Sequence, residues 1–230
     1  MASAAHTDRM PVPKAVLFDL DGTLADTAPD LVHALNTLRL ERGLGAVDYA
    51  QARAQASHGA AALLRLGFDV GPADVRYDAL RTRFLALYEN GGCVRTLLFP
   101  GMQTLLDSLR AQGYQTGIVT NKPSYLTTRV LAALQLVPPP DCVVSGDTTA
   151  FCKPHPEPLW HAARLLGQSA EHCVFLGDAE RDIAAGRAAG MRTLVALFGY
   201  LRPDDTPATW GADGLVQTPA DILTWLARWS

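Results

Sequence analysis

The sequence predicts an α/β fold in which a Rossmann-like parallel sheet core carries an inserted, all-helical cap domain. Short apolar runs alternate with segments of helical periodicity over most of the 230 residues, which is typical of a parallel sheet covered by helices. Residues 28–96 break this alternation, because they contain helical patterns and no convincing strand. We therefore expect residues 14–27 and 97–230 to form the core, residues 28–96 the cap, and residues 1–13 a flexible tail.

Five strands and three covering helices are predicted for the core. The strands are the apolar runs at residues 15–18, 115–120, 142–145, 173–177 and 192–198, and turn residues follow each of them. Apolar side chains three or four residues apart predict helices around residues 105–109, 126–134 and 159–166.

Two apolar stripes predict helices within the cap region. They comprise Leu31, Leu35 and Leu38, and Val75, Ala79, Leu80, Phe84, Leu87 and Tyr88. The insert leaves the core just after residue 23 and returns at residues 99–101, so it should lie over the strand ends, where open α/β sheets bind ligands. A lid at that place excludes water and selects substrates.

The composition argues against several classes of function. A net charge of -3 lacks the basic excess with which proteins bind nucleic acids or membrane surfaces. No apolar stretch approaches the roughly 18 residues of a membrane span, and the first dozen residues lack the apolar core of a signal peptide. The four cysteines show neither metal-ligand spacing nor the density of a disulfide scaffold. We expect a cytoplasmic monomer or homodimer that acts on a small diffusible molecule.

The segment FDLDGT at residues 18–23 places two carboxylates where the first strand ends. Residues i and i+2 of an extended chain point the same way, so Asp19 and Asp21 can face one reaction centre while Gly22 lets the backbone turn. One carboxylate can attack and the other can transfer a proton. Taken alone, the motif also fits a turn in which Asp21 and Thr23 only cap the next helix.

Two further polar groups follow later strands. Thr120 and Asn121 precede Pro123, which can begin a helix, so a hydroxyl, an amide and a helix N-terminus meet there and suit a phosphate. Lys153 offers a compact positive charge that can offset phosphate and carboxylate charge. Each group alone fits a helix cap or a solvated loop, but their joint occurrence at successive strand ends indicates an active site.

A third group, Asp178 and Asp182, follows the strand at residues 173–177. Carboxylate oxygens are the ligands that Mg2+ prefers, and Asp19 with Asp178 would supply half of its coordination shell. The simpler interpretation is that Asp178 and Asp182 are helix caps or surface charges.

Lysine is rare in this chain. Only three of the 20 basic residues are lysines, and two of these, Lys122 and Lys153, flank the expected phosphate site, where an ammonium fits better than a planar guanidinium. We expect Lys153 to be the catalytic cation and Lys122 to be secondary, because a side chain directly after Asn121 can point away. Lys14 is expected to be solvated.

The four motifs DLDGT, TN, KP and GDxxxD, in this order, resemble those of the haloacid dehalogenase (HAD) superfamily, and the helical insert resembles its type 1 cap. The segments VTNKP, KPHPEPL and GDAERDIAAGRAAG and the Gly199-Tyr200 pair are similar to bacterial phosphoglycolate phosphatases. The segments GYLRPDDTPATWGAD and ERGLGAVD are similar to the related N-acetylmuramic acid 6-phosphate phosphatases. Both resemblances imply hydrolysis of a phosphomonoester, and they differ in the substrate.

This resemblance implies a Mg2+-dependent reaction through an aspartyl phosphate. Asp19 would be the nucleophile and Asp21 the general acid and base. Mg2+ would be bound by Asp19, the Asp21 carbonyl and Asp178, and the phosphoryl group by Thr120, Asn121 and Lys153. Asp182 and Glu180 are the candidates for orienting Lys153 or a metal-bound water, and Asp182 is the stronger of the two.

The acid at position 21 argues against two branches of the superfamily. Dehalogenases lack an acid there, and transport ATPases carry a threonine. A phosphosugar mutase is the enzymatic alternative. The non-enzymatic alternative is a module that accepts a phosphoryl group as a signal, although such a module needs no cap of about 70 residues.

One turn of the cap region is a candidate for substrate selection. Ser57, His58, Gly59 and Ala60 precede an apolar helix, and His58 can reach a substrate oxygen or carboxylate. Alternatively, Ser57 caps the helix and His58 is solvated.

Overall fold

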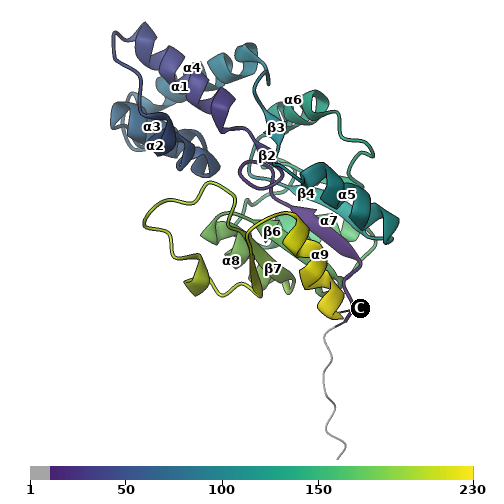
Figure 1. Ribbon diagram of the computed structural model, residues 1–230. Coiled ribbons are helices and arrows are strands. Elements are labelled where there is room, and N and C mark those ends of the chain that lie inside the picture. The colour runs from purple at the N-terminus through teal and green to yellow at the C-terminus, as the bar shows by residue number, and fades with distance from the viewer. Residues whose placement is uncertain (1–10, 230) are drawn as a thin grey trace, which may run out of the picture.

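The computed structural model describes residues 11–229 and has the predicted α/β fold (Figure 1). Its central sheet contains six parallel strands in the order β5-β4-β1-β6-β7-β8. They are β1 (Ala15–Phe18), β4 (Gln115–Val119), β5 (Cys142–Val144), β6 (Cys173–Gly177), β7 (Arg192–Ala196) and β8 (Gly214–Val216). The first five agree with the sequence prediction within two residues at each end, whereas β8 is not predicted. Residues 1–10 of the predicted tail lie outside the described residues.

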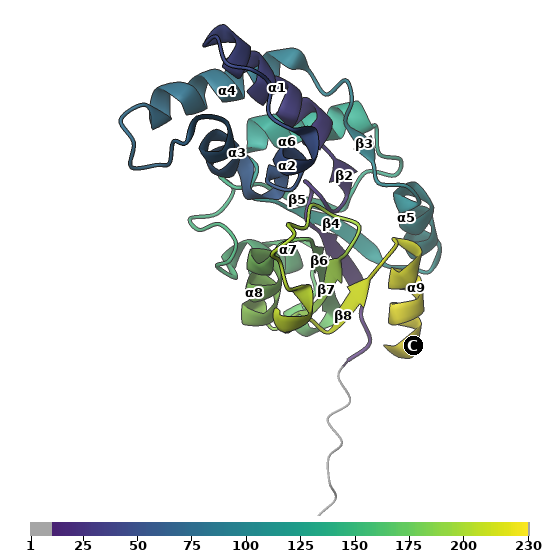
Figure 2. The ribbon, with the colours of Figure 1, turned by 60° about the vertical axis from the view of Figure 1, so that its left-hand side comes forward.

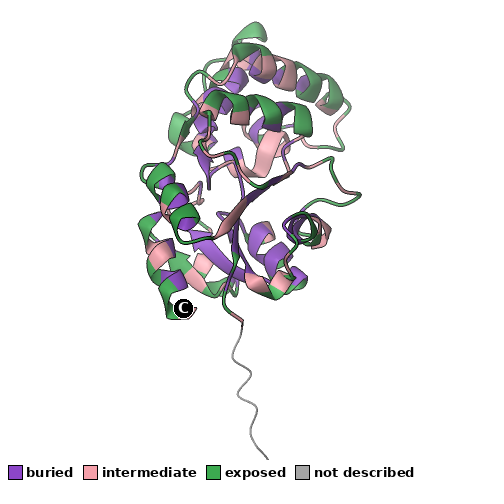
Figure 3. Cartoon of the chain, turned by 90° about the vertical axis from the view of Figure 1, so that its right-hand side faces the viewer, coloured by how far each residue is buried: buried purple, intermediate pink, exposed green. Residues whose placement is uncertain are grey.

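Helices cover both faces of the sheet (Figure 2). Helices α5 (Met102–Ala111) and α9 (Ala220–Leu226) lie on one face, and α7 (Glu157–Leu165) and α8 (Glu180–Ala189) on the other. Helix α6 (Ser124–Leu134) follows β4, and short 3-10 turns lie at Ala170–His172, Pro207–Thr209 and Ala227–Trp229. The strands are therefore buried between two helical layers, as Figure 3 shows and as parallel sheets require.

The insert consists of helices that pack on one another above the sheet (Figure 1). They are α1 (Ala28–Glu41), α2 (Tyr49–Arg53), the 3-10 turn η1 (Ala56–His58), α3 (Gly59–Phe68) and α4 (Tyr77–Gly91). The predicted apolar face of α4 needs one correction: Val75 is 97% exposed and Ala79 is also exposed. Val75 precedes α4, which begins at Tyr77, and Ala79 lies in the helix but off its buried stripe of Leu80, Phe84 and Tyr88.

A short antiparallel pair of strands connects the cap to the core. Strand β2 (Ala25–Asp26) pairs with β3 (Leu97–Leu98), where the chain leaves and re-enters the core. Asp26 accepts hydrogen bonds from Arg53 of the cap (2.5 Å) and from the Tyr200 hydroxyl of the core (2.7 Å). The Arg53 guanidinium also lies 4.6 Å from the centroid of the Tyr200 ring. The connection is thus fixed to both parts of the molecule.

The structure also bears on possible membrane spans and on the state of the cysteines. Within residues 11–229, no helix combines the length and the apolar character needed to cross a membrane. All four cysteines are free thiols.

The packing of α8 on the sheet generates a stability prediction. A Cβ atom at Gly186 would overlap Thr193 Cγ2 of β7, so Gly186→Ala should lower the free energy of unfolding by about 1–3 kcal/mol, measured by urea denaturation. Gly91→Ala is the control, because nothing lies within 4 Å of a Cβ there. It should be neutral or stabilise the protein by up to about 1 kcal/mol. A Gly186→Ala protein as stable as the wild type would contradict this packing.

Candidate active site

The predicted site residues meet at one edge of the sheet. Asp19 follows β1, Thr120 follows β4 and Asp178 follows β6, and β1 lies between β4 and β6. From β1, the strands follow one another in sequence toward both edges of the sheet, β4 and β5 on one side and β6, β7 and β8 on the other. Open α/β sheets form a ligand crevice at such a point, at the carboxyl ends of their strands.

Lys153 contacts residues at the carboxyl ends of β1 and β4 and in helix α8. Its Nζ lies 2.9 Å from Asp19 Oδ1 and 2.8 Å from Asp182 Oδ1, and it donates a hydrogen bond to the Val119 carbonyl (2.8 Å). The side chain is only 1% exposed. Burial by itself would lower the pKa of Lys153, but the two carboxylates raise it above its ordinary value. The ammonium is therefore charged, and three oxygens of the protein lie within 2.9 Å of its nitrogen.

Asp182 has the position that the sequence predicts, beside Lys153. Its side chain is fully buried and accepts a hydrogen bond from the Ala179 amide (3.1 Å). Burial opposes its ionisation, yet Lys153 and then Arg181 hold the pKa of Asp182 below its ordinary value. Asp182 therefore contacts the lysine directly, whereas Glu180 is exposed.

Asp178 differs from its neighbours because only neutral groups contact it. Its Oδ2 accepts hydrogen bonds from Ser57 Oγ (2.6 Å) and the Tyr200 amide (2.9 Å), and Thr23 Oγ1 lies 3.4 Å from Oδ1. Burial, with the charges of Asp19 and Asp182, raises the pKa of Asp178 to about 7. Among the described residues, no basic group lies within 4.0 Å of this carboxylate. Its charge thus lacks a counterion from the protein.

The oxygens around Asp178 fit a divalent metal ion. Ser57 Oγ lies within hydrogen-bond distance of both Asp178 Oδ2 (2.6 Å) and the Asp21 carbonyl oxygen (3.1 Å), so these two oxygens converge. Oxygens of Asp19, Asp178 and Asp182 lie within 4.8 Å of one another. A Cβ at Gly22 would overlap Asp178 Oδ2, so glycine permits this approach. An all-oxygen set with uncompensated charge is the environment that hard divalent cations prefer.

Lys122 holds the second carboxylate of the first motif. Its Nζ lies 2.8 and 3.0 Å from the two oxygens of Asp21, and Thr27 Oγ1 donates a hydrogen bond to Asp21 Oδ1 (2.5 Å). The expectation that Lys122 points away is therefore wrong. The reason is that the chain turns after β4, so that the side chain is buried against Tyr88, 4.9 Å from the ring centroid.

Thr120 and Asn121 both lie at the site. Thr120 is buried, and its Oγ1 accepts a hydrogen bond from the Lys122 amide (3.2 Å). The Asn121 side chain pairs with the backbone of Lys153, through Nδ2 to the carbonyl (2.8 Å) and Oδ1 to the amide (3.0 Å). It therefore holds the Lys153 loop in place, and its contact with a phosphate stays a prediction.

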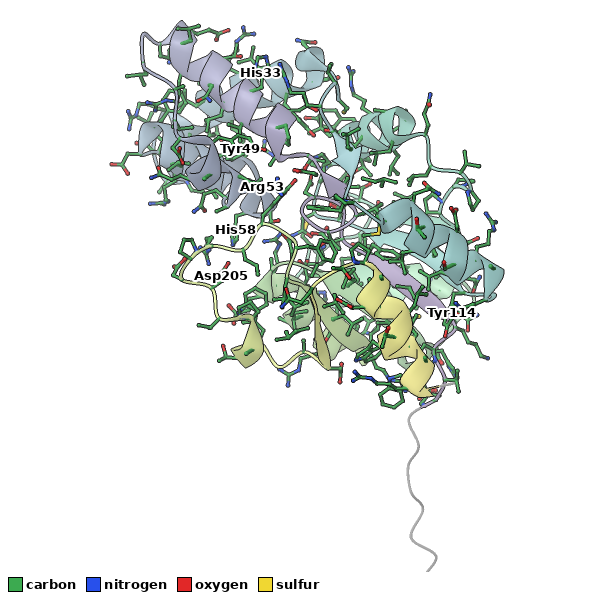
Figure 4. All side chains as sticks on the ribbon, in the orientation of Figure 1. His33, Tyr49, Arg53, His58, Tyr114 and Asp205 are labelled. Atoms are coloured by element: carbon green, nitrogen blue, oxygen red, sulfur yellow. The ribbon has the colours of Figure 1, made fainter. Side chains whose placement is uncertain are left out.

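A cavity of about 500 Å³ lies between these groups and the cap. Its acidic and basic lining residues are Asp19, Asp21, His58, Arg81, Lys122 and Arg181. Figure 4 shows His58 at the edge of the cap that faces the core loop with Asp205. Burial, followed by the charges of Arg181 and Arg202, lowers the pKa of His58, so its ring is neutral near pH 7. Within the described part of the chain, His58 Nδ1 is buried and has no hydrogen-bond partner.

The alternative interpretation of the cap turn is wrong. Ser57 does not cap α3, because its hydroxyl bonds to Asp178 and to the Asp21 carbonyl instead. His58 is half-buried rather than solvated. The turn therefore reaches from the cap to the acidic groups of the core.

Two arginines of the cavity are missing from the sequence prediction. Arg81 comes from α4 and Arg181 from the first turn of α8. Another arginine of the cap, Arg53, pairs with Asp26 and is not among the lining residues. The sequence does contain a signal for Arg181, because this residue lies inside the GDxxxD motif, three residues after Asp178. The first turn of a helix that follows a strand faces the ligand edge of the sheet, so a side chain at this position can reach the site.

The fold and the site together define a capped α/β protein with a buried acidic group at the carboxyl ends of its strands. Residues 16–196 match the family described as haloacid dehalogenase-like hydrolase, and the chain belongs to this family. The predicted family and fold class are therefore confirmed. Phosphatases of this family generally use a divalent metal ion, and the acidic group described above is suited to hold one.

Individual proteins that the chain is similar to are named as phosphatases. The chain is 45% identical to a phosphoglycolate phosphatase of Xanthomonas campestris over 93% of this chain and 96% of that protein. It is 39% identical to an N-acetylmuramic acid 6-phosphate phosphatase of Pseudomonas putida over 91% and 94%. The crystal structure of a predicted phosphoglycolate phosphatase from Haemophilus somnus aligns with a TM-score of 0.81, at 26% identity over 93% and 97% of the two chains. The prediction of a phosphatase-type hydrolase is confirmed at the level of enzyme class.

The raised pKa of Asp178 predicts how metal binding depends on pH. A carboxyl group whose pKa rises from 3.8 to about 7 on folding contributes stability below about pH 4 that is lost as the pH rises through 7. Asp178→Asn should therefore raise the Tm of the chelator-treated protein more at pH 8 than at pH 5. Conversely, Mg2+ or Mn2+ should raise the Tm of the wild type more at pH 8, because the metal must displace the proton.

The control for this thermal-shift experiment is Asp107→Asn, which changes an exposed acid far from the site. It should leave the metal-dependent rise in Tm intact, whereas Asp178→Asn should remove it. An equal rise in both variants would show that Asp178 does not bind the metal.

Proposed function

We propose that this chain is a Mg2+-dependent phosphomonoester hydrolase that works through an aspartyl phosphate, with phosphoglycolate as the first candidate substrate. The observation that carries the proposal is that Asp19 and Asp21 line one cavity while each is held by a different lysine. The phosphoglycolate phosphatase with 45% identity over most of both chains supports the choice of substrate.

Asp19 has the geometry of the nucleophile. Lys153 pairs with its Oδ1, which leaves Oδ2 to attack phosphorus. The attack forms the aspartyl phosphate and breaks the bond from phosphorus to the ester oxygen. A water molecule then attacks the same phosphorus atom, which releases phosphate and restores the carboxylate.

Asp21 transfers the protons in both steps. It donates a proton to the leaving alkoxide in the first step and accepts one from the attacking water in the second. Lys122 and Thr27 contact its carboxyl group. We infer that these contacts hold the carboxyl group in place beside the cavity.

The charge of the transferring phosphoryl group needs several donors. Lys153, the Thr120 hydroxyl and the backbone amides that follow Asp19 supply them on the core side. Asn121 acts through its bonds to the Lys153 backbone. Bound Mg2+ would be held by Asp19, the Asp21 carbonyl and Asp178, and it would supply further positive charge to the phosphoryl oxygens.

A second candidate substrate is N-acetylmuramic acid 6-phosphate. The cavity of about 500 Å³ falls within the range of about 300–1,000 Å³ that holds ligands of drug size, and it offers more room than a two-carbon acid needs. Tyr77, Phe84 and Leu85 of α4 add apolar surface to its lining. The relative from Pseudomonas putida with 39% identity bears the name of this activity.

The direct test of both candidates is a phosphate-release assay. Phosphoglycolate, N-acetylmuramic acid 6-phosphate and a panel of sugar phosphates are compared with and without Mg2+. EDTA should stop the release and Mg2+ should restore it, whereas Ca2+, with its looser geometry, should support little turnover. Full activity after exhaustive chelation, or no phosphate release from any substrate, would refute the proposal.

The two carboxylates should respond differently to amidation. Asp19→Asn removes the nucleophile and should lower kcat to less than about a thousandth of the wild-type value. Asp21→Asn should lower kcat at least about a hundredfold, because it removes the proton transfer. Steady-state kinetics measures both effects, and circular dichroism checks the fold. A folded Asp19→Asn enzyme with a tenth of the wild-type activity would exclude covalent catalysis by Asp19.

Lys153 should not tolerate arginine. Its ammonium fits between Asp19, Asp182 and the Val119 carbonyl, where a planar guanidinium does not. Lys153→Arg should therefore lower kcat by at least about a hundredfold at unchanged net charge. Lys14→Arg is the matched control, because Lys14 is exposed, and it should retain full activity. Equal activities of the two variants would show that charge alone matters at position 153.

A further inference from the structure

We propose that Arg181 recognises a carboxylate on the leaving group of the substrate. This inference rests on the proposed phosphatase activity and adds a residue that determines its specificity. The assignment follows from the position of Arg181, from the charge balance of the cavity and from the donors that its guanidinium leaves available.

Arg181 reaches from the core toward the cap. It is the second residue of α8, its side chain lines the cavity, and its Nη2 donates a hydrogen bond to the Ser57 carbonyl (2.6 Å). Because Ser57 belongs to the cap turn, the guanidinium lies at the boundary between core and cap. The phosphoryl group must bind deeper, beside Asp19 and Lys153, so Arg181 is placed for the part of the substrate that leaves.

Basic residues outnumber acidic residues in the lining of the cavity, with Arg81, Lys122 and Arg181 against Asp19 and Asp21. Asp19 is paired with Lys153, and Asp21 is paired with Lys122. Within residues 11–229, neither Arg181 nor Arg81 has a carboxylate partner within 4.0 Å, although both line the cavity. A carboxylate on the ligand, beyond its phosphate, would give one of these arginines an ionic partner.

Arg181 is better suited to this role than Arg81. The contact with Ser57 fixes one end of the Arg181 guanidinium, and its remaining N–H donors match the two oxygens of a carboxylate. Arg81 is exposed on the outer part of the cavity wall, and no described hydrogen bond fixes its side chain. His58 Nδ1, buried and without a partner, adds a second polar group next to Ser57.

The chemistry of the named relatives agrees with this assignment. Phosphoglycolate and N-acetylmuramic acid 6-phosphate differ greatly in size, yet the leaving group of each carries a carboxylate. One arginine at the boundary of core and cap can therefore serve a small or a large substrate acid.

The test compares matched substrate pairs with the Arg181→Met enzyme. One pair is phosphoglycolate and 2-hydroxyethyl phosphate, and the other is N-acetylmuramic acid 6-phosphate and N-acetylglucosamine 6-phosphate. In each pair only the first leaving group carries a carboxylate. Loss of a charged hydrogen bond should lower kcat/KM for the hydrolysed acid by about tenfold to a hundredfold. The partner without the carboxylate, and p-nitrophenyl phosphate, should change less than about threefold.

Three control variants complete the design. Arg187→Met removes an exposed arginine of the same helix, whose Nη1 donates a hydrogen bond to the Trp210 carbonyl, and it should behave as wild type. Arg181→Lys keeps the charge without the planar fork and should show an intermediate loss. Arg81→Met should spare the preference for the acid.

Each other outcome overturns the proposal in a recognisable way. Equal losses on all substrates would show that Arg181 serves the phosphoryl chemistry or the closure of the cap. An unchanged preference in Arg181→Met, or a selective loss in Arg81→Met, would refute the assignment. If Arg181→Met does not fold, inhibition of wild-type p-nitrophenyl phosphate turnover decides: glycolate must inhibit more strongly than ethylene glycol. A wild type that releases phosphate from no substrate would refute the proposed function itself.

Discussion

Concentration of negative charge at one edge of the sheet is the constraint on which the rest of the site depends. Asp19, Asp178 and Asp182 are almost completely buried there, and Asp21 is close to them. Isolated buried carboxylates are very unfavourable, so the fold must supply partners. Lys153 compensates Asp19 and Asp182 together, and Lys122 compensates Asp21. The one carboxylate that is left to neutral donors, Asp178, marks where a cation from solution is needed.

The same constraint connects the acidic edge to the cap. The neutral donors of Asp178 are a cap hydroxyl, Ser57, and a core amide, Tyr200. Tyr200 also donates its hydroxyl proton to Asp26 in the strand that leads to the cap, and that hydroxyl accepts a hydrogen bond from the Ala28 amide. Cap position and the surroundings of Asp178 are therefore linked through a few named hydrogen bonds, while Asp19, Asp21 and Lys153 themselves lie in the core.

The sequence was sufficient for those features that follow from strand ends. Parallel strands bring their carboxyl ends to one edge, so the polar residues after β1, β4 and β6 could be grouped without coordinates. Side-chain direction after a strand was not predictable: Lys122 turns inward to Asp21, and Arg181 crosses to the cap. The contact between Ser57 and Asp178 joins distant parts of the chain that share no local pattern. Strands β2 and β3, with two residues each, are too short to show periodicity.

The oxygens around the Lys153 ammonium have a consequence for ligand binding. Its nitrogen already lies within 2.9 Å of oxygens of Asp19, Asp182 and the Val119 carbonyl. A phosphoryl oxygen can bind only by taking over one of these bonds, so the net gain is an exchange and is smaller than capture by a vacant donor. An anion that enters the site therefore gains less from Lys153 than it would from a free ammonium. The arrangement that neutralises the resting site also limits how tightly this lysine can hold a ligand.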